Sequence, residues 1–221
     1  MKTNTQNLLK KISLKVLVVV CLFLASLFIF AFIAHEAVYE NEDAFDKSII
    51  SFISSHSTPG LIRIMDDFTF FGSSKFLLPA YIILVGYFLI IKRFHYAIDI
   101  SIIALSSMAL MFGLKQLFHR QRPQLPIIKG ITTYSFPSGH ALSSFIFCSI
   151  LAWLIWDGTL RPAWKCVLII LLVLFSITIG ISRIVLNVHY ATDVIAGFCL
   201  GITWVILSFG AIKKIHTRPL S

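Results

Sequence analysis

His189 and Asp193 are the two side chains whose types and spacing best suit covalent chemistry. On a helix, residues four apart lie on one face, so the carboxylate can accept a hydrogen bond from one imidazole nitrogen. That bond would fix the tautomer of the ring and leave the other nitrogen free as a nucleophile. A histidine and an aspartate one turn apart also commonly form an ordinary interfacial hydrogen bond, so the pair alone leaves its function open.

Three cations, Lys115, Arg122 and Arg183, give the pair a chemical context. A cation near hydrocarbon is costly to hold unless an anion compensates it. Arginine offers a planar fork and lysine a point charge, a combination that suits phosphoryl oxygens. Basic residues at the end of a membrane span also commonly reach out to lipid headgroups, and any one of the three taken alone is open to that interpretation.

The stretch Pro-Ser-Gly-His at 137–140 has the features of a helix start that could bind an anion. Proline suits the first helical turn, and a glycine lets an anion approach the backbone. The amides of Ser138, Gly139 and His140 would point out of the helix N-terminus, with the Ser138 hydroxyl as a further donor. Four residues are also compatible with an ordinary helix start. Their interest lies in bringing a second histidine, His140, to face the first.

A metal site is the rival interpretation, because two histidines and an aspartate are acceptable zinc ligands. The three cations would repel a divalent ion, and the motifs contain no carboxylate besides Asp193. We therefore expect no metal and no cofactor. The four cysteines all fall inside apolar runs, where they behave as small apolar residues, and we expect no disulfide among them.

The composition places these residues in a membrane protein. Apolar residues make up 57% of the 221 residues and charged residues 13%, whereas soluble domains usually have about 25% charged residues. A span needs about 20 apolar residues, and its backbone groups must be paired within a helix. The sequence predicts one all-α domain over 1–221, a six-transmembrane-helix bundle. The predicted spans are 14–37, 76–91, 94–118, 138–156, 163–183 and 189–212.

The segment 41–68 has a different pattern. Apolar residues at 45, 49, 52 and 53, and again at 61, 64, 65 and 68, predict two short amphipathic helices. They could lie in the membrane interface beside the bundle, or form a folded loop on the end of the bundle. The polar sides of these helices carry Glu42, Asp43, Asp46, Asp66 and Asp67. We expect this acidic segment to lie apart from the three cations.

Charge sets the expected orientation. The first apolar run is longer than the core of a signal peptide and lacks a clear cleavage site, so we expect it to be an uncleaved span. More of the 19 Lys and Arg residues fall on the side of the two termini than on the other side, which predicts cytoplasmic termini. The three motifs then meet at the outer ends of the third to sixth spans. The net charge of +9 is spread between apolar runs, so a nucleic-acid partner is not expected.

Together the motifs resemble a known signature. The patterns K-x6-R-P at 115–123, P-S-G-H at 137–140 and S-R-x5-H-x3-D at 182–193 are similar to the three-part signature of the type 2 phosphatidic acid phosphatases, a superfamily of lipid phosphatases and haloperoxidases. All the fixed residues match in order and spacing. The six predicted spans extend the likeness to small bacterial membrane members with a polar segment between the first two spans.

The resemblance implies a role for each motif residue. His189 would attack phosphorus to form a phosphohistidine, Asp193 would orient it, and His140 would protonate the leaving oxygen and then activate water. The residues implied to bind the phosphoryl oxygens are Lys115, Arg122, Ser138, Gly139 and Arg183. No metal or cofactor is implied, and the expected partners are the bilayer and a lipid phosphate within it, with no protein partner indicated.

The substrate and the exact activity remain open on the sequence. Membrane members of this family act on phosphatidic acid, phosphatidylglycerol phosphate, isoprenyl diphosphates or lipid A phosphates. His119, Arg120 and Lys129 add positive charge and could hold a second phosphate, as in undecaprenyl diphosphate, or could be ordinary basic residues beside a span. Lipid-to-lipid phosphate transfer on the same site is one alternative to hydrolysis, and a non-catalytic lipid-binding or transport protein is another.

Overall fold

Helices make up every regular element of the described chain, which comprises residues 14–40, 43–128 and 130–216 of the computed structural model. Six helical stretches within these residues are long and apolar enough to cross a membrane, so the predicted six-span all-α architecture is confirmed. The elements are α2 (Leu14–Ala34), η1 (His35–Tyr39), α3 (Ala44–His56), α4 (Pro59–Phe70), α5 (Ser74–Ile90), α6 (Phe94–Phe118), α7 (Gly139–Asp157), α8 (Pro162–Val185) and α9 (Ala191–His216).

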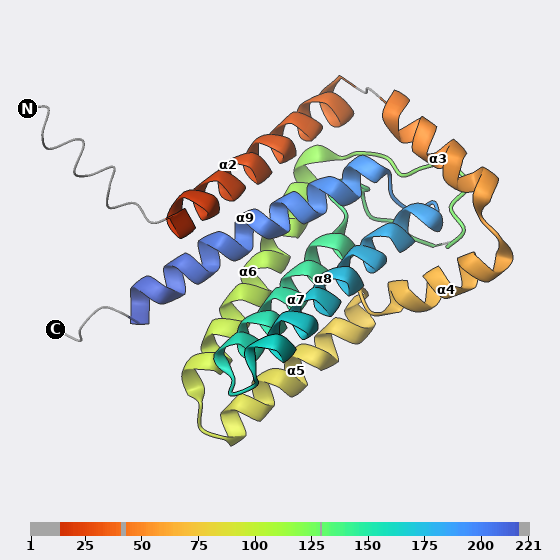
Figure 1. Cartoon of the computed structure of the whole chain (residues 1–221). Coiled ribbons are helices and arrows are strands. Elements are labelled where there is room, and N and C mark those ends of the chain that lie inside the picture. The colour runs from red at the N-terminus through yellow and green to blue at the C-terminus, as the bar shows by residue number, and fades with distance from the viewer. Residues whose placement is uncertain (1–13, 41–42, 129, 217–221) are drawn as a thin grey trace, which may run out of the picture.

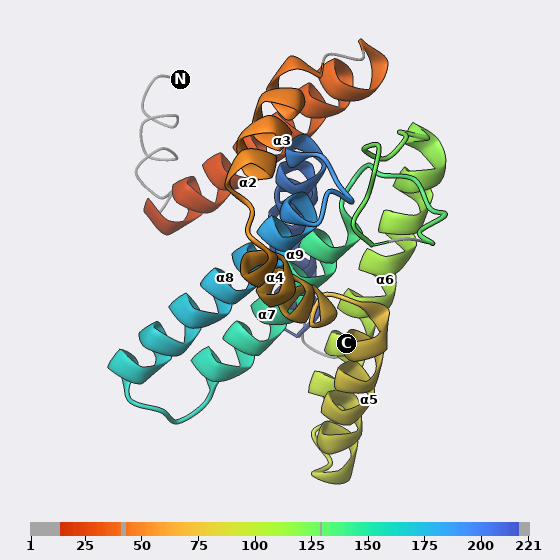
Figure 2. The same cartoon turned by 90° about the vertical axis from the view of Figure 1, so that its right-hand side faces the viewer.

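The bundle pairs helices that are distant in the sequence. The first span, α2, packs along the last one, α9, and α7 lies between α8 and α9 (Figures 1 and 2). Ser26 of α2 and Thr203 of α9 form a buried hydrogen bond with 2.8 Å between their hydroxyl oxygens. Ile100, Leu142 and Ile146 are fully buried in the main core. This packing brings the ends of α6 and α8 and the beginnings of α7 and α9 to one end of the bundle.

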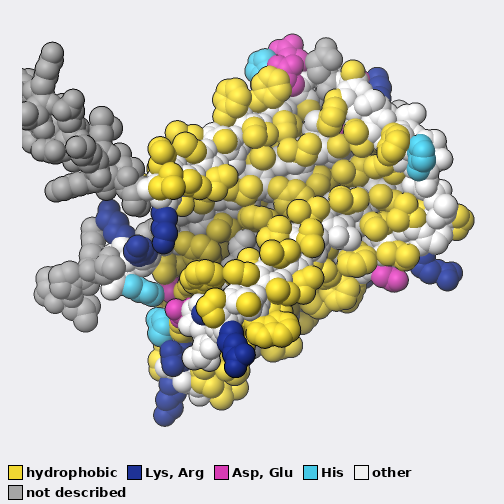
Figure 3. Space-filling model, in the orientation of Figure 1, with side chains coloured by type: hydrophobic (Ala, Val, Ile, Leu, Met, Phe, Trp, Pro, Cys, Tyr) yellow, Lys and Arg dark blue, Asp and Glu magenta, His cyan; other side chains and the backbone are white. Residues whose placement is uncertain are grey.

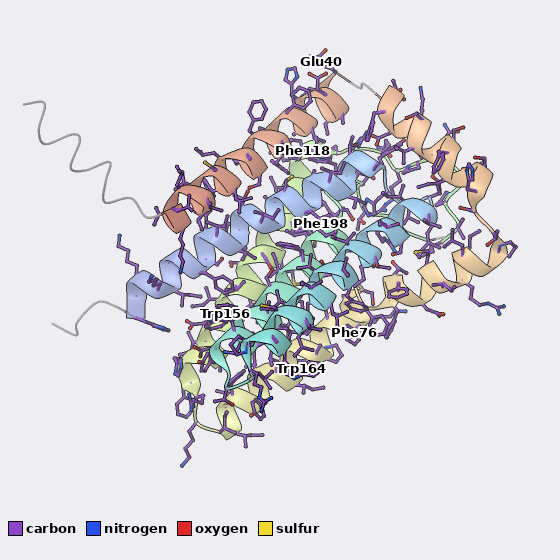
Figure 4. The ribbon with its side chains drawn as sticks, in the orientation of Figure 1. Glu40, Phe76, Phe118, Trp156, Trp164 and Phe198 are labelled. Atoms are coloured by element: carbon purple, nitrogen blue, oxygen red, sulfur yellow. The ribbon has the colours of Figure 1, made fainter. Side chains whose placement is uncertain are left out.

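The outer surface is apolar along most of the length of the bundle. Figure 3 shows hydrophobic side chains covering the sides, with basic residues gathered towards the two ends. Trp156 and Trp164 are 62% and 61% exposed and lie at the turn between α7 and α8, far from the beginning of α9 (Figure 4). Exposed tryptophans at one level are typical of the boundary between lipid and water.

The two helices predicted within 41–68 are present as α3 and α4, at the end of the bundle where α8 ends and α9 begins (Figure 1). Thr58 caps α4, because its hydroxyl accepts a hydrogen bond from the Leu61 amide at 3.2 Å. The sequence pattern predicts the two faces of α3 but not which of them meets the bundle. Phe45 and Phe52 are 53% and 62% exposed, whereas Asp46 is 1% exposed and faces the bundle. Of the remaining acidic residues on the predicted polar sides, Glu42 lies outside the described residues.

Candidate active site

The three motifs meet at one end of the bundle. Lys115 lies in the last turn of α6, Arg183 in the last turn of α8, and Asp193 in the first turn of α9. Ser138 caps α7, and its amide donates a hydrogen bond to the Asp193 carbonyl at 3.0 Å. A Cβ atom on Gly197 would lie 2.8 Å from the Ser138 carbonyl oxygen, so a glycine is needed for α9 to approach α7 this closely.

The histidine of the predicted pair is held between a carboxylate and an arginine. Nδ1 of His189 lies 3.3 Å from Oδ2 of Asp193, and Nε2 lies 3.2 Å from Nη1 of Arg122. A guanidinium can only donate, so Nε2 accepts and the ring proton is assigned to Nδ1. The Ser135 hydroxyl also donates to Oδ2 of Asp193, and the Tyr190 amide does so at 2.9 Å. The lone pair of Nε2 therefore points toward Arg122.

Burial sets the electrostatics of this histidine. His189 is 2% exposed, and burial lowers its pKa from 6.5 to about 4, although Asp193 acts to raise it. The cations Arg122 and Lys115 act in the same direction as burial. Burial also lowers the pKa of Arg122. At neutral pH the ring of His189 is uncharged, which is the form that a nucleophilic imidazole requires.

Lys115, Arg122 and Arg183 are held by neutral groups. The Lys115 ammonium donates to the Tyr134 carbonyl at 2.5 Å, and Arg122 donates to the carbonyls of Thr133 and Val188 at 2.7 and 2.6 Å. Among the described residues, none of the three cations forms an ion pair with a carboxylate. Three cations that converge without a carboxylate partner favour an anionic ligand.

Arg183 makes a contact with the segment that was expected to lie apart. Its Nη1 donates to the Thr69 hydroxyl of α4, while its buried Nε has no hydrogen-bond partner in the described structure. A donor left without a partner in a buried site is costly, and an anion beside it would remove that cost. Arg183 therefore has both a fixed orientation and a remaining donor.

The start of α7 differs in detail from the prediction. The Ser138 amide is already bonded to Asp193, so only the amides that follow it remain to face an anion. The Ser138 hydroxyl accepts from the Ala141 amide at 3.5 Å, which is the usual role of a helix cap. A Cβ atom on Gly139 would lie 2.6 Å from the Met111 sulfur and 3.8 Å from Cε of Lys115. Gly139 thus brings the helix start close to the lysine.

His140 lies against the turn between α4 and α5. A Cβ atom on Gly72 would lie 2.6 Å from Cγ2 of Ile179 and 3.0 Å from Cδ2 of His140, so this close packing favours a glycine beside the ring. Arg183, His189, Arg122 and Lys115 are all close enough to His140 to affect it electrostatically. The structure thus brings both histidines and all three predicted cations together.

The expectation that the acidic outer segment lies apart from the site is wrong. Oδ2 of Asp46 in α3 lies 2.8 Å from Nη2 of Arg120, and Oδ1 of Asp193 lies 2.6 Å from Nη1 of the same arginine. Burial acts against the charge of Arg120, but the two carboxylates outweigh it and raise its pKa. No spacing rule pointed to Asp46, Thr69 or Ser135, because their partners lie far away in the sequence.

Of the three further basic residues predicted beside the site, two have other partners in the structure. Arg120 is paired with two carboxylates, the ring of His119 packs against the ring of Tyr134, and Lys129 lies outside the described residues. In the described parts of the chain, no three His, Cys, Asp or Glu side chains are grouped so that they could hold a metal ion.

The comparisons with known proteins agree with this geometry. The model of the PAP2 superfamily matches residues 96–216. Phosphatidylglycerophosphatase B from Bacillus subtilis is 30% identical over 206 residues, which cover 89% of this chain and 95% of that protein. An undecaprenyl-diphosphatase from Sulfolobus acidocaldarius is 36% identical over 91 residues, 38% of this chain and 39% of its own length.

Two solved structures have a similar fold. A crystal structure of a transmembrane PAP2-type phosphatidylglycerolphosphate phosphatase from Bacillus subtilis has a TM-score of 0.75 and 29% identity, and covers 90% of this chain and 98% of its own. A crystal structure of LpxE from Aquifex aeolicus has a TM-score of 0.59 and 22% identity, covering 76% of this chain and 97% of its own. By sequence and by fold, the chain belongs to the PAP2 superfamily, as a multi-pass membrane lipid phosphatase.

Proposed function

We propose that the chain hydrolyses a lipid phosphate through a phosphohistidine formed on Nε2 of His189. The observation that carries this proposal is the placement of that nitrogen, uncharged and 3.2 Å from Arg122, while Asp193 holds the opposite side of the ring. Phosphoryl transfer depends on in-line positioning and on charge stabilisation more than on other chemistry. The oriented imidazole and the cations at this end of the bundle support the proposal, because they could supply both.

The reaction has two steps. Nε2 of His189 attacks phosphorus while the bond from phosphorus to the lipid oxygen breaks. His140, which is protonated when the anionic substrate is bound, gives its proton to that oxygen. A water molecule then attacks phosphorus, the bond to His189 breaks, His140 takes the proton from the water, and inorganic phosphate leaves. Asp193 keeps the imidazole oriented throughout.

The phosphoryl oxygens would be bound by the remaining motif residues. The charged ones, Lys115, Arg122 and Arg183, neutralise the negative charge that spreads over these oxygens in the transition state. The Ser138 hydroxyl and the Gly139 amide add neutral donors at the start of α7. None of these steps requires a metal ion, and no cofactor takes part.

The site would act at the outer face of the membrane, on a lipid that stays in the bilayer. The excess of basic residues at the opposite end of the bundle supports cytoplasmic termini. A site at the depth of the headgroups suits a lipid that presents its phosphate while its tails remain in hydrocarbon. Phosphatidylglycerol phosphate, phosphatidic acid and undecaprenyl diphosphate are the substrate candidates, the first and last because of the names of the relatives.

The direct test is phosphate release by the purified protein in detergent micelles with each of the three lipids. We expect release to continue in EDTA and to be inhibited by vanadate. Acid-labile, alkali-stable labelling of the protein from a 32P-labelled lipid would identify the phosphohistidine. Loss of activity in EDTA that added metal restores would contradict the mechanism. Label that reaches an acceptor lipid before it reaches solution would instead indicate phosphate transfer between lipids.

The acidity of His189 gives a prediction for the pH profile. Its pKa in the folded protein is lowered to about 4 from 6.5, so the neutral nucleophile persists as the pH falls through 6.5. The pH dependence of kcat/KM reports the pKa values of the free enzyme. We therefore expect the decrease in kcat/KM caused by protonation of His189 to be centred near pH 4. The folded state also binds fewer protons than the unfolded chain between these two values, so stability should decrease as the pH falls through that window.

The measurement is kcat/KM between pH 4 and pH 8, with the ionisation of the lipid phosphate followed separately by 31P NMR and its contribution subtracted. A remaining acid limb centred near pH 6.5 would contradict the buried, uncharged imidazole.

A further inference from the structure

Arg120 pairs with two buried carboxylates at the catalytic end, although none of the roles proposed above uses it. Its guanidinium donates to Oδ2 of Asp46 at 2.8 Å, to Oδ1 of Asp193 at 2.6 Å, and to the Thr192 hydroxyl at 2.8 Å. Its side chain is 9% exposed, and the side chains of both aspartates are fully buried. Such a contact set belongs to a fixed structural element rather than to a mobile surface cation.

Asp46, Arg120, Thr192 and Asp193 form one buried hydrogen-bond network, and Tyr190 packs against it. The amide and the hydroxyl of Thr192 both donate to Asp46, at 3.0 and 2.5 Å. The guanidinium carbon of Arg120 lies 4.2 Å from the centre of the Tyr190 ring, which covers one face of the cation. A phosphoryl oxygen at this guanidinium would therefore compete with two buried carboxylates that Nη1 and Nη2 already bind.

The two oxygens of Asp193 have separate partners. Oδ1 is bonded to Arg120, while Oδ2 receives the Ser135 hydroxyl and the Tyr190 amide and lies 3.3 Å from Nδ1 of His189. Holding one oxygen fixes the rotation of the carboxylate and therefore the aim of the other oxygen. A misplacement of about 1 Å at a reacting group can cost about a hundredfold in rate.

We propose that Arg120 is a positioning residue that sets the orientation of Asp193, and that Asp46 of the outer helix α3 holds Arg120 in place. Arg120 is then not a ligand for a second phosphate. The inference rests on the proposed role of His189 as the nucleophile. It gives the outer segment a function in catalysis, because α3 reaches the nucleophile through two consecutive buried ion pairs.

The test compares Arg120→Gln, Asp46→Asn and the double variant on a lipid monophosphate, phosphatidic acid, and on a lipid diphosphate, undecaprenyl diphosphate. We expect Arg120→Gln to lower kcat about 100-fold and Asp46→Asn about 10-fold on both substrates. KM should change by less than about threefold, because the lost interaction acts on the reacting geometry and not on binding. The double variant should be no slower than Arg120→Gln, since Asp46 acts through Arg120.

Matched controls separate positioning from general damage. Asp43→Asn breaks an exposed ion pair with Lys47 in the same part of the chain, and Arg161→Gln removes an exposed arginine between α7 and α8. Both should retain wild-type kcat. Elution and melting temperature in detergent establish that each variant is folded. If Asp46→Asn does not fold, Thr192→Val removes the hydroxyl that donates to Asp46 and accepts from Arg120, and should lower kcat. Thr192→Ser, which keeps the hydroxyl, should retain wild-type kcat.

The outcomes that would overturn the inference are specific. A selective increase in KM for the diphosphate in Arg120→Gln would make Arg120 a phosphate ligand. Unchanged kcat in folded Asp46→Asn and Thr192→Val would remove α3 from the network. A loss in the double variant equal to the product of the two single losses would show that the two residues act independently. No phosphate release from the wild-type protein would instead reject the proposed function, and the inference with it.

Discussion

Replacing His189 with glutamine is expected to abolish turnover, with a loss of about 10⁴-fold or more in kcat. Glutamine approaches the size of histidine but has no nitrogen that can form a stable bond to phosphorus. The phosphoenzyme should disappear together with phosphate release. Binding of a non-hydrolysable phosphonate analogue of the lipid should be largely retained, because Lys115 and Arg183 are untouched.

The matched control for this variant is His56→Gln, which makes the same substitution at an exposed histidine at the end of α3. It should retain wild-type turnover. Phosphate release from His189→Gln above about 1% of wild type would contradict the mechanism, since no residual covalent route should be that fast. A phosphoenzyme that persists in His189→Gln would move the nucleophile to another residue.

Replacing Asp193 with asparagine is expected to be the second most damaging change, with a loss of about 10³- to 10⁴-fold in kcat. An asparagine amide can donate to Nδ1 of His189 and so favours the wrong tautomer of the ring. The same change removes one of the two carboxylates from buried Arg120. We therefore expect a lower melting temperature in addition to slower chemistry.

The two effects of Asp193→Asn can be measured separately, by kcat at a temperature well below unfolding and by thermal unfolding in detergent. Asp67→Asn, at an exposed position on α4, is the matched control and should change neither quantity. Turnover within about tenfold of wild type in folded Asp193→Asn would show that the carboxylate does not orient the nucleophile.

The spans and the ends at which the motifs meet could be predicted from the sequence. The reason is physical: hydrocarbon requires a long apolar helix with internally paired backbone groups, so the length of an apolar run nearly determines the element. The predicted ends differ from the observed ones by at most about one helical turn, and the span 94–118 matches α6 at both ends. Because the helices alternate in direction, the position of each motif at the end of a span also determines which end of the bundle it occupies.

The orientation of α3 could not be predicted, because an amphipathic helix beside a membrane can turn its apolar face either toward the bundle or toward the lipid. In a soluble protein the apolar face of a helix turns inward. Beside lipid it can turn outward, and this is what Phe45 and Phe52 do while Asp46 turns in. A pattern of polar and apolar positions identifies the two faces but not which of them meets the bundle.

The sequence also could not predict which partner each charged side chain has in the folded protein. Arg120 and Arg122 are two residues apart and equally basic, yet one is paired with two buried carboxylates and the other only with neutral groups and the imidazole. The difference depends on Asp46, which is 74 residues away along the chain. Ser135 likewise gains its role only because the connection before α7 folds back over Asp193.

The pairing of α2 with α9 has a consequence for biosynthesis. Of the described helices, α2 is synthesised before all the others and α9 after them, so α2 must wait in the lipid without its neighbour. Its Ser26 hydroxyl can be satisfied meanwhile by the Phe23 carbonyl of the same helix, 3.0 Å away, and can exchange onto Thr203 later. Since Asp193 also lies on α9, the catalytic end can assemble only after this helix has been synthesised.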